Sequence, residues 1–152
     1  MYDFPVFLSL SDMPVVIIGG GKIAFRKAVK LEPSGADITV VAPEFHADFE
    51  QWALGKKIRM IKDKARPEHI SGAFLIISAS GSREAINMLK AHHSPNQLIN
   101  GADDKTFGNT AFPAVIKEKE FQIAVSTGGR SPRLAKAIKN YLHSIKKQLR
   151  HL

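Results

Sequence analysis

The sequence predicts an α/β protein in which a parallel sheet carries helices on both faces. Apolar runs rich in β-branched residues alternate with stretches of helical periodicity over residues 1–110. Such alternation is typical of strand–helix–strand units, whose right-handed crossovers place successive strands in one parallel sheet. After residue 110 the pattern changes to two short strands and one long helix, so we expect two domains, 1–110 and 111–152.

Five strands are expected in the first domain, each centred on a short, mostly apolar run. They are 15–18, 38–41, 58–61, 74–77 and 97–99. The helices are expected at 22–32, 44–54 and 82–93. Pro33 ends the first helix, because proline cannot donate a backbone hydrogen bond. The apolar segment 4–10 is a candidate edge strand.

The second domain is expected to form a β-hairpin followed by a long amphipathic helix. Strands at 111–116 and 121–126 are joined at 117–120, and Ser131 caps a helix whose first position is Pro132. The apolar face of this helix contains Leu134, Ile138, Tyr141, Leu142, Ile145 and Leu149. A lone hairpin and helix need a further surface to pack on, so we expect this domain to form a homodimer interface.

Composition excludes several classes of site and location. The chain has no cysteine, which rules out disulfides, thiolate metal sites and cysteine nucleophiles. The apolar N-terminal segment carries Asp3 and Asp12 and has no basic stretch before it, so it resembles neither a signal peptide nor a membrane span. We therefore expect a cytoplasmic protein without membrane contact.

The net charge of +8 is concentrated near the C-terminus. Residues 1–120 hold 15 basic and 14 acidic side chains, whereas residues 121–152 hold seven basic ones and no acidic one. The seven are Arg130, Arg133, Lys136, Lys139, Lys146, Lys147 and Arg150. This block indicates either an anionic partner or a solvated helix face.

The segment 15–24, VVIIGGGKIA, contains the pattern G-x-G-x-x-A directly after a predicted strand and at the start of a predicted helix. Gly19 would permit the tight turn, Gly21 would let a pyrophosphate approach the backbone, and Ala24 would keep helix and strand close. The context favours a Rossmann-like dinucleotide site over a merely flexible turn, because the helix N-terminus adds unpaired N–H groups.

The cofactor type depends on the residues that follow the second strand. An acidic residue there usually holds the adenosine ribose, and the nearest one is Glu44. Glu44 could instead favour the start of the next helix. No basic residue lies between Asp37 and Lys56, so NAD is favoured over NADP.

Two further segments are candidates for chemistry. Asn100-Gly-Ala-Asp-Asp follows a predicted strand, where ligands bind in open parallel sheets, although these residues also form ordinary turns. The loop Ser126-Thr-Gly-Gly-Arg-Ser-Pro could hold an anion or only connect a strand to a helix. The six histidines show no metal-ligand spacing, and G-x-S-x-G is absent, so a metal site and a serine hydrolase are not expected.

Together these segments resemble the precorrin-2 dehydrogenase family, which also forms the N-terminal module of siroheme synthases. The similarity covers nearly the whole chain in order, and its S-[ST]-G-G-x-S-P element is specific. Its parts are FPVF at 4–7, GGGKIA at 19–24, RKA at 26–28, GADITVVAP at 35–43, NGAD at 100–103, FP at 112–113, VSTGGRSP at 125–132 and LA at 134–135. Many members of this family continue into a further helical domain, of which this sequence would contain the first helix.

The resemblance implies NAD-dependent oxidation of precorrin-2 to sirohydrochlorin in siroheme biosynthesis. It implies catalysis by Asp103, and the neighbouring Asp104 is expected to form the turn. The implied cofactor contacts are Gly19, Gly20, Gly21, Lys22, Ile23, Pro43 and Glu44. The expected substrate contacts are Thr127, Gly128, Gly129, Arg130 and Arg133.

A tetrapyrrole with many carboxylates would account for the basic block. Two alternatives remain. The same aspartate could also serve iron insertion into sirohydrochlorin, or the chain could be a non-catalytic, NAD-sensing dimeric module. No nucleic-acid-binding motif is present, so no nucleic-acid partner is expected.

Overall fold

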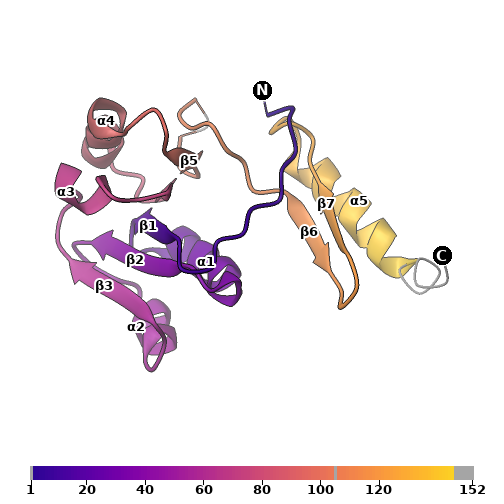
Figure 1. Cartoon of the computed structure of the whole chain (residues 1–152), viewed down its shortest axis with the longest axis horizontal. Coiled ribbons are helices and arrows are strands. Elements are labelled where there is room, and N and C mark those ends of the chain that lie inside the picture. Colours follow the sequence, from indigo (N-terminus) through magenta and orange to yellow (C-terminus); the bar gives the residue numbers. More distant parts are fainter. Residues whose placement is uncertain (1, 105, 146–152) are drawn as a thin grey trace. The chain divides into compact units, whose positions relative to one another are not determined.

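The computed structural model describes residues 2–104 and 106–145, and its contacts divide the chain into two compact units (Figure 1). The sheet unit spans Val6–Thr110, and the hairpin unit holds Ala111–Leu152 together with Met1–Pro5. Four residues expected on the last helix lie outside the described residues: Lys146, Lys147, Leu149 and Arg150.

The sheet unit contains five parallel strands in the order β3-β2-β1-β4-β5, as the alternation of strands and helices predicts. Their bounds are β1 Pro14–Ile18, β2 Asp37–Ala42, β3 Ile58–Lys62, β4 Leu75–Ser78 and β5 Leu98–Gly101. The chain runs outward from β1 to β3 and then returns to the other side of β1. This reversal between β1 and β4 opens a crevice at the carboxyl ends of the strands, where α/β proteins bind ligands.

Helices cover the two faces of this sheet (Figure 1). Their bounds are α1 Lys22–Leu31, α2 Ala47–Ala53, α3 Pro67–Ile70 and α4 Arg83–His92, with a short 3-10 helix at Glu32–Ser34. On one face, α1 and α2 contact each other through Phe25 and Phe49, whose ring centroids are 5.2 Å apart. The second helix begins at 47 rather than 44, because His46 takes the N-cap and its Nδ1 accepts the N–H of Asp48.

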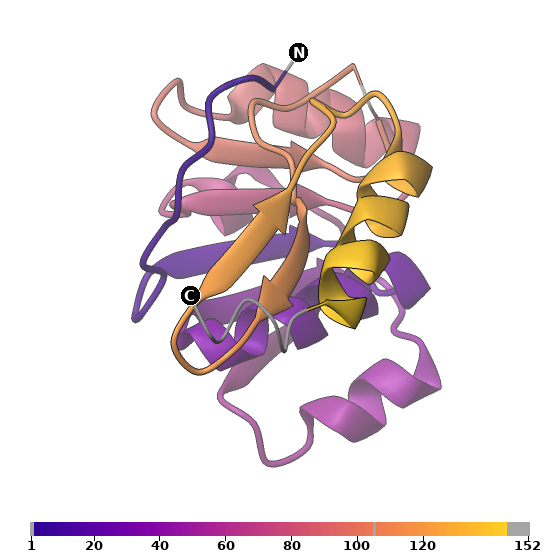
Figure 2. The same cartoon turned by 90° about the vertical axis from the view of Figure 1, so that its right-hand side faces the viewer.

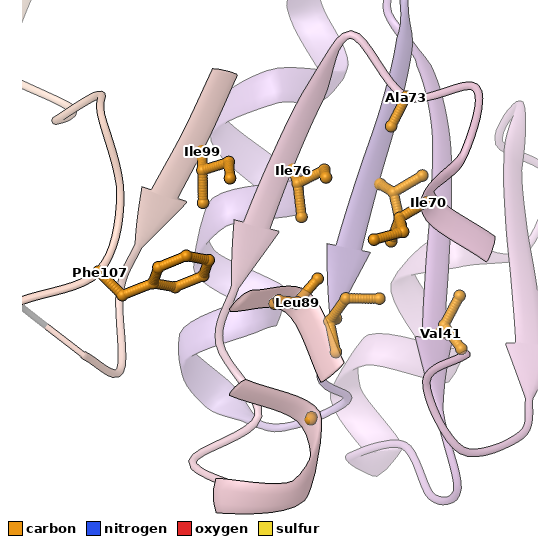
Figure 3. Packing of buried hydrophobic residues seen from close by; sticks show 10 residues of the cluster. Val41, Ile70, Ala73, Ile76, Leu89, Ile99 and Phe107 are labelled. Carbon is orange, nitrogen blue, oxygen red and sulfur yellow. The ribbon is translucent and has the colours of Figure 1, made fainter. Parts of the chain in front are cut away.

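A hydrophobic cluster fills the opposite face, against α3 and α4 (Figure 3). Ile76 and Ile99 lie on neighbouring strands, Leu89 comes from α4, and Phe107 comes from the loop after β5 (Figure 3). Val15 and Ile17 of β1 are fully buried, as is Ile77 of β4. Burial on both faces explains why these strands are continuous apolar runs rather than alternating ones.

The loop after β5 closes the edge of the sheet with side-chain amide groups. The Oδ1 of Asn109 accepts the N–H of Ile99 at 2.7 Å, and its Nδ2 donates to the carbonyl of Gln97 at 2.9 Å. The N–H groups of Asn109 and Thr110 both donate to the carbonyl of Ile99. Asn109 therefore replaces a neighbouring strand, and the same loop carries Asp103.

The prediction of an edge strand at 4–10 is wrong. Residues 2–10 form no strand, and the side chains of Phe4 and Phe7 are 85% and 71% exposed. Pro5 interrupts this segment and has no N–H to donate to a neighbouring strand.

The hairpin unit contains the predicted hairpin and helix: β6 Ala114–Lys117, β7 Gln122–Val125 and α5 Pro132–Ser144. The strands pair antiparallel, with Ala114 opposite Val125, and α5 packs alongside them (Figure 2). Ser131 is the N-cap, since its Oγ accepts the N–H of Leu134 at 3.2 Å. No helix within the described parts of the chain is long and apolar enough to cross a membrane.

Candidate functional site

The glycine turn after β1 is packed tightly on two sides. Gly19 has a φ of 131°, and a Cβ there would collide with the carbonyl oxygen of Ala79 at the end of β4. A Cβ on Gly20 would collide with the carbonyl oxygen of Glu44. In contrast, a Cβ on Gly21 would meet nothing within 4 Å. The first two glycines therefore allow the strand ends to approach, and the third leaves open space.

The start of α1 is suited to an anion. Gly21 is the N-cap and supplies no side-chain hydrogen bond, and the first turn contains no acidic residue. Its N–H groups are therefore left for a bound phosphate, which the positive end of the helix dipole also favours. Ala24 is fully buried, as close packing of helix on strand requires.

A cavity of about 440 Å³ lies at this end of the sheet unit, within the range of small-molecule sites. Five of the seven residues expected to contact the cofactor line it: Gly19, Gly20, Gly21, Pro43 and Glu44. Ser80, Ser82 and Ala85 line it from the β4–α4 connection and the start of α4. The glycine cradle, the open helix end and the cavity fit a dinucleotide.

Two expected cofactor residues are placed differently. Lys22 and Ile23 do not line the cavity; they are exposed in the first turn of α1, and the side chain of Ile23 is 45% exposed. Their backbone N–H groups, rather than their side chains, are suited to contact the phosphates.

Sequence reasoning missed Lys64 and Glu84, which also line the cavity. Lys64 follows β3 and Glu84 is in the first turn of α4, and their Nζ and Oε2 atoms are 3.6 Å apart. Lys64 lies beyond the range from Asp37 to Lys56 on which the preference for NAD was based, because it follows the carboxyl end of β3. The cavity therefore does contain a lysine, although an acidic partner offsets its charge.

Asp103 connects the ends of β5 and β4. Its Oδ2 accepts the backbone N–H groups of Ser80 at 2.9 Å and Gly81 at 2.8 Å. Its Oδ1 is buried and has no hydrogen-bond partner among the described residues. Oδ2 therefore joins the end of β5 to the β4–α4 turn, whereas Oδ1 is enclosed without a partner among the described residues.

The neighbouring Asp104 has a different environment. Its carboxylate accepts hydrogen bonds from the N–H and hydroxyl of Thr106 and from the Nζ of Lys90. These bonds, with Thr106 the larger cause, lower the pKa of Asp104 to about 2. Asp104 therefore stabilises the turn after β5 and is not directed to the cavity wall at Ser80.

A partly buried polar contact joins α1 to the end of β5. The Nζ of Lys27 donates to the Oδ1 of Asn100 at 2.9 Å, and the Nδ2 of Asn100 donates to the carbonyl of Thr110 at 3.0 Å. Burial, followed by the positive charges of Lys30 and Arg26, lowers the pKa of Lys27 to about 8. Asn100, in the segment that the sequence singled out, thus connects three elements of the sheet unit.

The expected substrate residues gather in and beside one loop of the hairpin unit. The Oγ1 of Thr127 accepts the N–H of Ser131 at 2.9 Å, and its carbonyl accepts from both the N–H and the Nε of Arg130. Gly128 and Gly129 have φ values of 63° and 83°, which favour glycine. Within the described part of the chain Arg130 forms no ion pair, so its charge is available to an external anion.

Comparison with known families matches most of the chain to a nucleotide-binding model. Residues 6–114 match the family described as putative NAD(P)-binding, and residues 121–144 match the central domain of sirohaem biosynthesis proteins. Among residues 2–104 and 106–145, no group of three or more histidine, aspartate or glutamate side chains could hold a metal ion. The prediction of a nicotinamide dinucleotide domain is confirmed.

Similar curated proteins are longer than this chain. The siroheme synthase of Neisseria meningitidis serogroup C is 36% identical over 147 residues, which cover 95% of this chain and 30% of that protein. The siroheme synthase of Photobacterium profundum is 34% identical over 144 residues, which cover 93% of this chain and 30% of that protein. The chain thus spans less than a third of the length of these relatives.

A solved structure is similar over most of both chains. SirC, a precorrin-2 dehydrogenase, is 33% identical with a TM-score of 0.84, and the match covers 93% of this chain and 70% of that one. This match confirms the predicted fold, a Rossmann-like parallel sheet followed by a hairpin and a long helix. The chain therefore belongs to the family of NAD(P)-binding proteins that includes the precorrin-2 dehydrogenase SirC.

Proposed function

We propose that the chain oxidises precorrin-2 to sirohydrochlorin in siroheme biosynthesis and uses NAD as the oxidant. The observation that supports this most is the position of Asp103, whose Oδ2 is bound to Ser80 and Gly81. Ser80 also lines the cavity that fits a dinucleotide, so a candidate catalytic carboxylate lies beside the candidate cofactor site.

The chemistry divides between the cofactor and the residues of the chain. Bound NAD supplies the acceptor for the hydride that leaves a saturated carbon of the macrocycle. The oxidation also releases one proton, and the carboxylate of Asp103 would accept it or orient the macrocycle. The N–H groups at the start of α1 hold the pyrophosphate, and Glu44 holds the ribose hydroxyls.

NAD is proposed over NADP because of the charges in the cavity. Glu44 would repel a 2′-phosphate, and the positive charge of Lys64 is offset by Glu84. The carboxylates of the macrocycle would bind Arg130 and Arg133, with Thr127, Gly128 and Gly129 shaping the loop. Both arginines are exposed and form no ion pair within the described residues.

We also propose a cytoplasmic homodimer. Leu134 and Tyr141 of α5 have side chains 52% and 65% exposed, and Ile138 lies beside them at 38%. A second copy would remove this apolar face from water. The absence of cysteine is compatible with the reducing cytoplasm.

The test is turnover of precorrin-2 by the purified protein with NAD, followed by the absorbance of sirohydrochlorin and of NADH. We expect equal amounts of both products from the wild type and at least about a hundredfold lower kcat from Asp103→Asn, within the range of general acid–base catalysis. Arg130→Ala should raise KM at low salt more than it lowers kcat.

Two outcomes would contradict this proposal. A wild-type protein that binds NAD but never oxidises precorrin-2 would favour the non-catalytic sensing module. An Asp103→Asn variant with wild-type kcat would remove the catalytic role. Iron insertion into sirohydrochlorin, measured without NAD, is a separate assay, and no observation favours that activity over dehydrogenation.

A further inference from the structure

The turn between β4 and α4 is held by a residue from another strand end. The N–H groups of Ser80 and Gly81 both donate to the Oδ2 of Asp103, and the Oγ of Ser80 lies 3.5 Å from the same oxygen. Ser80 and Gly81 are exposed, so this carboxylate, rather than burial, fixes the turn. Hydrogen bonds from backbone N–H groups to a carboxylate are about twice as strong as those between neutral groups.

This turn is part of the wall of the dinucleotide cavity. Ser80 and Ser82 line the cavity, and a Cβ on Gly19 would lie 2.9 Å from the backbone nitrogen of Ser80. The Oγ of Ser80 also accepts the N–H of Ser82, which in turn caps α4 through Ala85. A shift of Ser80 would therefore change both the space beside the glycine cradle and the start of α4.

We propose that Asp103 is a positioning residue for the dinucleotide in addition to its proposed role in catalysis. Oδ2 holds the β4–α4 turn in the shape that accepts the cofactor, and the reaction is a second, separate role of the same carboxylate. The catalytic role of Asp103 rests on the proposed function. Its role in positioning the dinucleotide requires only that the chain binds NAD. Removal of the carboxylate would replace its two charge-assisted bonds with bonds to water and release the turn.

The chain offers a matched control in the adjacent aspartate. Asp104 accepts hydrogen bonds from Thr106 and Lys90 and has no contact with Ser80 or Gly81 among those that the structure gives. Asp104→Ala removes the same charge one residue away and leaves the β4–α4 turn intact. Any general effect of charge on NAD binding would appear in this variant too.

The experiment measures NAD affinity by calorimetry for four proteins: the wild type, Asp103→Ala, Asp103→Asn and Asp104→Ala. Loss of the charge-assisted bonds should weaken NAD binding at least about tenfold in Asp103→Ala. Asp103→Asn keeps an oxygen acceptor and should stay within about threefold of the wild type, although its kcat falls. Asp104→Ala should bind NAD like the wild type.

Amide hydrogen exchange gives a second measurement that does not require Asp103→Ala to fold. The amides of Ser80 and Gly81 should be protected in the wild type, in contrast to exposed amides without an acceptor. Wild-type NAD affinity in Asp103→Ala, or unprotected amides at Ser80 and Gly81, would overturn the proposal. The proposed reaction would survive either result, because it is tested by turnover.

Discussion

The two units of the chain differ in how completely they bury their apolar side chains. In the sheet unit, Val15, Ile17 and Ile76 are completely buried, and helices cover both faces of the parallel sheet. In the hairpin unit, Ile116 and Ala135 are the only buried hydrophobic residues among those described, whereas Leu134 and Tyr141 are more than half exposed.

This difference separates a unit that covers its own apolar surface from one that leaves part of its apolar surface exposed. A parallel sheet is stable only when both of its faces are covered, and the sheet unit meets that requirement with its own helices. A two-stranded hairpin with one helix buries too little apolar surface to be stable alone. We therefore expect the sheet unit to determine stability and cofactor binding, and the hairpin unit to take part in association.

The largest expected difference between the two units is in the free energy of unfolding after one apolar side chain in each is truncated. Ile76→Ala should lower the free energy of unfolding by about 2–5 kcal/mol, because it leaves a cavity between two strands and α4. Leu134→Ala should change it by no more than about 0.5 kcal/mol in the monomer, because its side chain is exposed. Urea unfolding followed by circular dichroism measures both values.

The same exposed residue should control association. Sedimentation equilibrium should show a dimer for the wild type and a higher dissociation constant for Leu134→Ala, with unchanged circular dichroism. Equal destabilisation by the two truncations would contradict the distinction between the units. A wild type that remains monomeric at all concentrations would contradict the proposed dimer.

A smaller effect is expected from pH. The pKa of Asp104 is lowered from an ordinary 3.8 to about 2, so its bonds to Thr106 and Lys90 stabilise the fold above about pH 4. This contribution is lost as the pH falls through about 2, where the carboxyl is protonated in both states. Asp104→Asn should therefore lower the urea midpoint near pH 6 and match the wild type near pH 2. A difference that does not depend on pH would contradict this assignment.

Most helices and strands could be predicted from the sequence, whereas the contacts between them could not. Runs such as 15–18 and 38–41 predict their strands because both faces of those strands are buried. Segment 4–10 has the same apolar character but no strand beside it, and composition cannot show that. Helix α3 was missed because four residues are too few for a helical period.

In the candidate site, too, residues adjacent in sequence were predicted better than contacts between distant residues. The glycines of 19–21 are adjacent in sequence, so their pattern identifies the cradle. Lys64 follows β3 and Glu84 is in the first turn of α4, and only the order of strands in the sheet brings them to the cavity. The bond from Asp103 to Ser80 spans 23 residues and likewise depends on the pairing of β4 with β5.

The central claim, that the glycine turn after β1 holds NAD, is tested most directly by adding a side chain at Gly21. A Cβ there meets nothing within 4 Å, so Gly21→Val should fold normally while its side chain occupies space beside the cavity. Gly72→Ala is the matched control, since its Cβ is also unobstructed and it does not line the cavity. Calorimetry should show that the wild type and Gly72→Ala bind NAD more tightly than NADP, and that Gly21→Val binds NAD at least about a hundredfold more weakly. Wild-type NAD affinity in a folded Gly21→Val would contradict the account.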